Sequence, residues 1–258
     1  MVYKSDGFWR TVEFYREQPD INFKHNLILV LQLRDTVPAY KLWSTYPHLN
    51  AAFPSDQLSL PYITNREIDT NSDGKYDELN IDLKVSIGDN DEVIGAQLIL
   101  FFEYKLHSKI FLQMESIANI KYESPIAGRS LRVIGDLRLK QKEPLVYRRH
   151  HIGFNENIKD SQEFFVEDML ESYIRRNFST SLDFNTHYNW YSRKEKSSQF
   201  EINATLLYSE QMFYYKPGFW YLIKWAFIQY LYVYLVLYLI FKRIIEFVFG
   251  NRLLNCIV

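Results

Sequence analysis

Cysteine is almost absent from this chain, because its 258 residues include only Cys256, close to the C-terminus. A single cysteine cannot form an intramolecular disulfide, so any folded domain must be held together by its core. An excess of charge is also absent, since 30 basic and 31 acidic residues give a formal net charge of -1. The chain lacks the basic field that favours nucleic acid, and we expect no nucleic-acid partner.

Catalytic motifs are missing as well. The sequence contains no GxSxG, HExxH or Walker phosphate-binding motif. The histidines at 25, 48, 107 and 187 show no ligand spacing with cysteine or acidic residues. The run from Arg148 to His151 is interpreted as a basic loop, because adjacent side chains on a strand diverge. We therefore predict a non-enzymatic protein with no organic cofactor and no small-molecule substrate.

The first residues, Met1 to Glu17, have no apolar run long enough for a signal peptide or a spanning helix. The stretch from Phe219 to Phe241 is different, because its 23 residues carry one charge, Lys224, and ten of them are aromatic. At about 1.5 Å per residue, a helix of this length reaches about 34 Å and can cross a bilayer. A buried core helix is the alternative, but the uncharged run from Trp225 to Phe241 favours a transmembrane helix.

The flanks of this stretch indicate an orientation. Lys242 and Arg243 follow it directly, which predicts a cytoplasmic C-terminus. Two N-glycosylation acceptor patterns, at Asn177 and Asn203, precede it and favour an extracellular or lumenal N-terminal part. Tail-anchored insertion, with that part in the cytosol, is the alternative. The predicted division is a β-rich domain over 1–215, a transmembrane helix with its flanks over 216–245, and a cytoplasmic tail over 246–258.

Alternation of apolar and polar residues dominates the first 215 residues. It is clearest in 79–87, where every second residue is Leu, Ile or Val, as expected of a half-buried antiparallel strand. One segment, 161–176, has near-helical spacing of its apolar residues. We predict an antiparallel β-sandwich-like ectodomain with one helical insertion and a linker at 192–199. The predicted strands are 23–33, 79–87, 93–106, 109–117, 130–139 and 200–208.

The loop from 69 to 77, DTNSDGKYD, has the spacing of a calcium-binding loop. Side-chain oxygens stand at loop positions 1, 3, 5 and 9, namely Asp69, Asn71, Asp73 and Asp77. The backbone carbonyl of Lys75 supplies a further oxygen, and Gly74 permits the sharp turn. A strand follows and Asn80 stands where an EF-hand has glutamate, so we predict a structural calcium loop between strands. The alternative is an acidic turn without metal, since Asp, Asn and Gly favour turns.

Short motifs follow one another along nearly the whole chain: GFW at 7–9, YREQP at 15–19, WST at 43–45, the 69–77 loop preceded by Arg66-Glu67, GAQLIL at 95–100, GDLRLKQKEPL at 135–145 and KPGFW at 216–220. Their order and spacing closely resemble the transmembrane protein 231 family. The resemblance implies a scaffold in the membrane of the ciliary transition zone, part of the tectonic-like, Meckel-syndrome complex. Such a protein is needed for cilium assembly, for the diffusion barrier at the cilium base and for Hedgehog-type signalling.

The resemblance also implies partners and a topology. The partners are tectonics, other transition-zone membrane proteins, proteins with B9-type domains and membrane lipid. The large domain is expected outside the cell and the C-terminus in the cytoplasm. Family members carry an N-terminal spanning helix before the GFW motif, and this chain begins just short of that helix, so we expect such a segment upstream. Two other functions stay open: a calcium-dependent adhesion or ligand-binding ectodomain unrelated to cilia, and a membrane-tethered glycan-processing enzyme.

Overall fold

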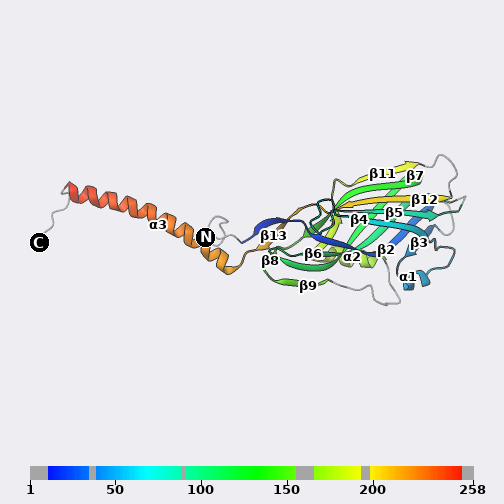
Figure 1. Cartoon of the computed structure of the whole chain (residues 1–258), viewed down its shortest axis with the longest axis horizontal. Helices are drawn as coiled ribbons and strands as arrows, with labels where there is room; N and C mark the ends of the chain where they lie inside the picture. The colour runs from blue at the N-terminus through cyan, green and yellow to red at the C-terminus, as the bar shows by residue number, and fades with distance from the viewer. Residues whose placement is uncertain (1–10, 35–38, 89–90, 155–165, 193–197, 252–258) are drawn as a thin grey trace. The chain divides into compact units, whose positions relative to one another are not determined.

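The computed structural model describes residues 11–34, 39–88, 91–154, 166–192 and 198–251, and it is mainly β (Figure 1). The chain divides into two compact units. The larger comprises Tyr15–Pro144 and Arg148–Phe213, and the smaller comprises Met1–Phe14, Leu145–Tyr147 and Tyr214–Val258. The predicted linker at 192–199 falls largely outside the described residues.

A ten-stranded sheet forms most of the larger unit. Its main path runs β3-β2-β6-β7-β12-β5-β4, and three further strands pair with β7. The strands of the path are β2 (Asp20–Arg34), β3 (Tyr40–Ser44), β4 (Pro61–Ile68), β5 (Glu78–Ser86), β6 (Glu92–Leu106), β7 (Phe111–Gln141) and β12 (Gln199–Leu207). The additional strands are β9 (His150–Phe154), β10 (Phe178–Leu182) and β11 (His187–Ser192).

Strand β5 confirms the clearest sequence pattern. Its apolar residues from Leu79 to Val85 are at most 1% exposed, and the residues between them face outward or are half-buried. The strand pairs antiparallel with both β4 and β12. A one-residue slip would turn the apolar residues to water, so this alternation fixes the register of all three strands.

Strands β2 and β6 are buried on both faces at their centres. In β6 every residue from Leu98 to Phe102 is at most 1% exposed. One face lies inside the sheet, and the other is covered by helices α1 (Pro47–Ala51) and α2 (Val166–Arg175). Leu49 and Tyr173 of these helices form one cluster with four sheet residues: Ile28, Ile99, Phe101 and Ile117. The helix predicted over 161–176 is thus confirmed over 166–175, and 161–165 lie outside the described residues.

The predicted strands 109–117 and 130–139 belong to a single strand, β7, of 31 residues. Between the two predicted segments, the pairing of β7 with β6 is irregular: Gly95 pairs with Glu123, but Val93 pairs with Gly128. Pro125 lies between these pairs and lacks the N–H that a ladder needs, which accounts for the bulge. Beyond it, β7 pairs with β11 and β12 instead of β6. A Cβ at Gly128 would overlap the indole of Trp190 in β11, so this contact requires glycine.

The sheet nearly closes on itself, which corrects the predicted sandwich of two stacked sheets. The backbone of Leu42 in β3 bonds to Gln57 and Ser59, at 2.9 and 3.3 Å, in the segment that leads into β4. The two ends of the sheet path are therefore linked through one chain segment. The long, bulged strands β2, β6 and β7 explain the difference, because bulges increase twist and let one sheet curve around its own core.

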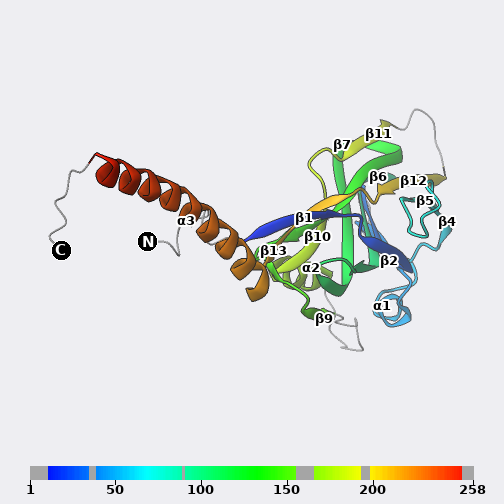
Figure 2. The same cartoon turned by 60° about the vertical axis from the view of Figure 1, so that its left-hand side comes forward.

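A smaller sheet has the order β1-β13-β8, with β1 (Glu13–Glu17), β8 (Leu145–Val146) and β13 (Gln211–Lys216). In the smaller unit, β8 runs parallel to β13, with Tyr215 opposite Leu145. The chain then continues into α3 (Phe219–Gly250), a helix of 32 residues (Figure 2). None of the side chains of α3 is buried.

Candidate functional site

The acidic loop at 69–77 joins β4 to β5, and its carboxylates are held by backbone donors. Asp69 Oδ2 accepts from the N–H of Gly74 at 3.0 Å, and Asp73 Oδ1 accepts from Lys75 at 2.8 Å. Asn71 Oδ1 accepts from the N–H of Asp73 at 2.9 Å. Ser72 and Gly74 have φ of 58° and 86°, so the turn uses the left-handed conformation twice. These bonds curl the predicted ligands into one compact turn.

Asp77 closes the loop. Its Oδ2 accepts from the N–H of Thr70 at 2.8 Å, and its Oδ1 accepts from the side chain of Gln18 at 2.6 Å. Donors to a carboxylate favour its charged form, so the Thr70 N–H and then the Gln18 amide lower the pKa of Asp77. Lys75 reaches out of the loop, and its Nζ donates to the carbonyl of Gln18 at 2.8 Å.

The fit of this loop to a calcium ion depends on which oxygens stay available. Within the described residues, no group of three or more His, Cys, Asp or Glu side chains is arranged to hold a metal ion. The predicted site also uses the side-chain oxygen of Asn71 and the backbone carbonyl of Lys75. Asp69 Oδ1, the first predicted ligand, is buried and accepts no hydrogen bond. A buried carboxylate oxygen without a partner is costly, and a cation would satisfy it. The calcium site stays a prediction, and Asp69 Oδ1 is the atom that a bound cation would satisfy.

The two predicted glycosylation acceptors occupy different surroundings. Asn177 is exposed at the bend between α2 and β10, and its carbonyl accepts from Lys142 N at 3.0 Å. Asn203 lies in β12, between β5 and β7, and its amide donates to Asp82 at 2.5 Å. A glycan on Asn177 would extend from a bend, whereas one on Asn203 would cover the outer face of the sheet.

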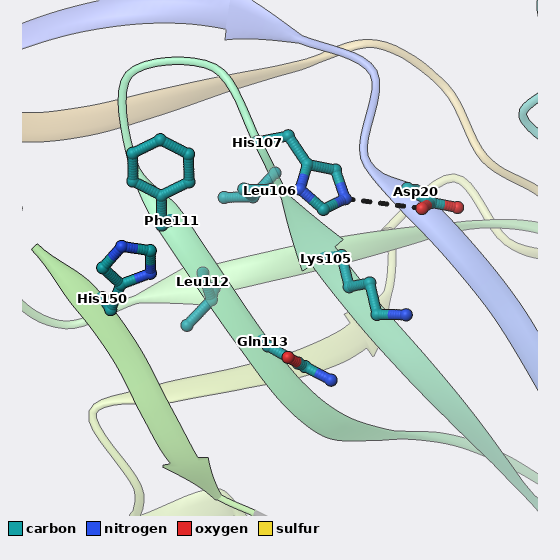
Figure 3. Close-up of a pocket in the computed structure, with 8 residues that line it drawn as sticks. All are labelled: Asp20, Lys105, Leu106, His107, Phe111, Leu112, Gln113 and His150. Atoms are coloured by element: carbon teal, nitrogen blue, oxygen red, sulfur yellow. Dashed lines mark ion pairs between the residues drawn. The ribbon is translucent and has the colours of Figure 1, made fainter. Parts of the chain in front are cut away.

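Sequence reasoning missed a hollow of about 380 Å³ at the end of the β6–β7 hairpin (Figure 3). His107 Nε2 lies 3.5 Å from Asp20 Oδ2, and the ring of His150 stacks on Phe111 with centroids 4.8 Å apart. The pairing of β9 with the start of β7 places His150 opposite Phe111. No local spacing signals this, because His107 lies in the turn after β6 and His150 begins β9, more than forty residues further along the chain.

The charges around this hollow are largely neutralised by each other. Lys105 Nζ lies 2.9 Å from Glu103 Oε2, and Gln113 donates to Glu103 Oε1 at 2.8 Å. The Lys105 ammonium is the main reason that the pKa of Glu103 is lowered. Among the described residues that line the hollow, Asp20 is the only carboxylate.

Helix α3 confirms that 219–241 is helical, and it continues to Gly250. Among the described residues, however, no helix combines the length and the apolar character that crossing a membrane requires. The membrane-spanning role predicted for 219–241 is therefore not supported.

The comparisons with known proteins agree over the whole chain. A family model described as Transmembrane protein 231 matches residues 1–258. A Xenopus tropicalis protein named Transmembrane protein 231 is 36% identical over 262 residues, which cover 100% of this chain and 83% of that protein. Proteins of the same name from Rattus norvegicus and Homo sapiens are 35% and 34% identical, with 100% of this chain and 82% of each relative covered. No solved structure matches.

Proposed function

Because the chain belongs to the transmembrane protein 231 family, we propose that it is a non-enzymatic membrane scaffold of the ciliary transition zone. Family membership over residues 1–258 is the observation that carries this proposal. The complex is the tectonic-like, Meckel-syndrome assembly, with tectonics, other transition-zone membrane proteins and B9-type-domain proteins as partners.

Helix α3 is the proposed membrane element, in the company of partner helices. Its apolar side chains are exposed along its length, so the described chain offers them no core. Tyr230, Tyr234 and Tyr238 form a stripe in which consecutive rings stack with centroids 6.3 and 6.4 Å apart. In a membrane, hydroxyl groups are satisfied by hydrogen bonds across helices, and this stripe supplies three of them on one face.

The proposed orientation places the larger unit outside the cytosol. Lys242 and Arg243 follow the apolar stretch, and both glycosylation acceptors precede it. The full-length protein is expected to carry glycans that a glycosidase removes, with a mass shift that Asn177→Gln together with Asn203→Gln abolishes. Each single variant serves as the control for the other site. Cleavage of the larger unit by protease added on the cytosolic side would contradict this orientation.

The acidic loop is proposed to hold one structural calcium ion. Asp69, Asn71, Asp73 and Asp77 would supply side-chain oxygens, and Lys75 its carbonyl. The support is the buried, unpartnered oxygen of Asp69 and the three negative charges in a turn of nine residues. The ion would neutralise their repulsion and fix the turn from which β5 begins.

The scaffold role is tested in ciliated cells that lack the protein. Tectonic recruitment to the transition zone should fall, and membrane proteins should leak between the cilium and the plasma membrane. Re-expression of the full-length protein should restore both, whereas a version without 219–258 should restore neither. Normal tectonic recruitment in the null cells would overturn the proposal.

A calcium-dependent adhesion or ligand-binding ectodomain is the second candidate. The observation that favours it is the exposed position of the acidic loop between β4 and β5. This candidate predicts a protein spread over the plasma membrane and calcium-dependent clustering of cells that express it. The scaffold proposal predicts enrichment at the cilium base and no such clustering.

A further inference from the structure

Strand β11 is an edge strand with a strand partner on one side only. Its residues His187 to Tyr191 pair antiparallel with β7, from Ile134 to Ser130. Among the described strands no other pairs with it, and Figures 1 and 2 both show it at the margin of the sheet. In an antiparallel pair, alternate residues turn their N–H and C=O groups away from the partner. The outer side of β11 is therefore a row of backbone groups that no strand satisfies.

At the other edges of the sheet, backbone groups are bonded to neighbouring segments of the chain. Strand β3 is covered by the segment from Gln57 to Ser59, and the N–H of Phe23 in β2 donates to the carboxylate of Glu67 in β4 at 2.9 Å. Edge strands are commonly blunted by lysine, proline or inward charges. The sequence of β11, HYNWYS, contains none of these. Among the described residues this edge has no strand partner, and its protection is limited to its short length and the irregularity between Tyr191 and Ser192.

Aromatic packing holds β11 rigid. Tyr188 stacks on Tyr122 of β7 with ring centroids 5.6 Å apart, and Trp190 lies 5.5 Å from the rings of both Tyr122 and Phe200. The indole N–H of Trp190 donates to the carbonyl of Ile126 at 2.9 Å. A strand fixed in this way needs little further ordering when it pairs, which favours binding.

A hollow of about 330 Å³ opens beside Tyr188, between β10, α2 and β7. Its polar floor is already satisfied, because the Tyr173 hydroxyl and Thr180 Oγ1 are 2.7 Å apart and both bond to Ile117 N. Phe184 and Ile174 at its lining are 99% and 63% exposed. The charged side chains that line it, Lys140 and Asp183, have opposite signs. Leu170, Ile174 and Phe184 supply apolar contacts beside polar ones, so the hollow suits an uncharged, bulky side chain better than a charged one.

We propose that β11 and this hollow form a strand-addition site for an extended, uncharged segment of a partner protein. The segment pairs its backbone with β11 and places a bulky apolar side chain in the hollow. This mode combines main-chain hydrogen bonds for affinity with a pocket for specificity. The register shift between Tyr191 and Ser192 limits the template to five residues, about 17 Å of strand. The proposal rests on the scaffold function and names the surface that one of its partners uses.

The probe is a set of blocked heptapeptides that alternate threonine with valine, leucine or phenylalanine, added to the full-length protein in detergent. Hydrogen exchange should slow in 187–192 and stay unchanged in β12. Two N-methyl groups on the pairing edge of the peptide should weaken binding about tenfold, since each removes a hydrogen bond. Phe184→Asp should also weaken it about tenfold by placing a charge at the apolar rim, whereas Leu60→Asp, at another exposed apolar side chain, should not.

Three results would overturn the proposal: no protection by any peptide at millimolar concentration, equal binding of the N-methylated form, or protection of 187–192 that depends on protein concentration without peptide. The last result would assign the edge to a second copy of the chain. Because the assay does not involve cilia, peptide binding by a protein that fails to reach the cilium base refutes the scaffold function alone. Correct location without peptide binding refutes this site alone.

Discussion

The sheet of the larger unit and helix α3 treat their apolar side chains in opposite ways. In the sheet, β6 buries both faces at its centre, against the interior on one side and α1 and α2 on the other. In α3 no side chain is buried, although most are aromatic or aliphatic. The sheet is therefore stabilised by contacts within its own chain, whereas the apolar side chains of α3 are not buried among the described residues. The sheet therefore accounts for the stability of the fold, and α3 is the element from which a proposed attachment is argued.

The largest expected effect is on the buried core of the sheet. Phe102 is fully buried, with its ring centroid 5.5 Å from that of Phe23 and 6.2 Å from that of Tyr208. Phe102→Ala should lower the free energy of unfolding by about 3 to 5 kcal/mol, because it removes a buried ring and leaves a cavity. Phe241→Ala in α3 should change it by less than about 0.5 kcal/mol. Denaturant titration in detergent measures both, and equal losses would contradict the comparison.

The next effect is that of calcium, which should stabilise the larger unit and leave α3 unchanged. Stability of the larger unit should rise by about 2.7 kcal/mol when free calcium is a hundredfold above its dissociation constant. Asp73→Ala should remove most of this dependence. Lys75→Ala is the control, because its side chain bonds to Gln18 and only its backbone carbonyl would contribute to the proposed site. The same melting temperature in millimolar calcium and in chelator would leave the metal-free turn as the correct interpretation.

A smaller effect is expected at the buried hydroxyl of Tyr173. It accepts from the N–H of Thr180 at 2.7 Å and lies within 3.2 Å of Ile117 N. Tyr173→Phe should lower the free energy of unfolding by about 1 to 3 kcal/mol, because it leaves a buried N–H without an acceptor. Tyr191→Phe, which removes a more exposed hydroxyl, is the matched control. A loss of the same size in both would mean that the buried network adds nothing.

The smallest effect is a pH dependence at the acidic loop. The pKa of Asp77 is lowered in the folded state, chiefly by the N–H of Thr70. Its contribution is therefore present above the unfolded pKa of about 3.9 and is lost as the pH falls through the lower, folded pKa. Asp77→Asn should flatten the fall of stability as the pH drops below about 4. The free energy of unfolding is measured by urea titration at each pH. If its slope against pH is the same in both proteins, the hydrogen bonds to Asp77 do not contribute to stability.

Local patterns predicted one part of this fold and missed another for a physical reason. Alternation in 79–87 and the apolar run in 93–106 directly reflect burial, so β5 and β6 were predicted within a residue or two of their bounds. The partners of β7 change along its length, and no local pattern encodes that change. Strands β9, β10 and β11 are short and stabilised by pairing with β7, so the sequence alone did not reveal them. The curvature that nearly closes the sheet depends on bulges such as the one at Pro125.

The candidate sites divide along the same line. The acidic loop was recognisable because its predicted ligands are close in sequence, and the structure folds them into one turn. The hollow with His107 and His150 was not, because strand pairing between β7 and β9 brings its residues together. The strand-addition site likewise depends on which edge of β11 is left open, and sequence does not specify that edge.

The most direct test of the central claim is where the full-length protein is located in a ciliated cell. The proposal is that α3 anchors the β-rich unit to the membrane of the ciliary transition zone. A tagged full-length protein, imaged at super-resolution with a cilium-base marker, should form a ring at the transition zone, and removal of 219–258 should disperse it. An even distribution over the plasma membrane, or a ring that persists without α3, would contradict the account.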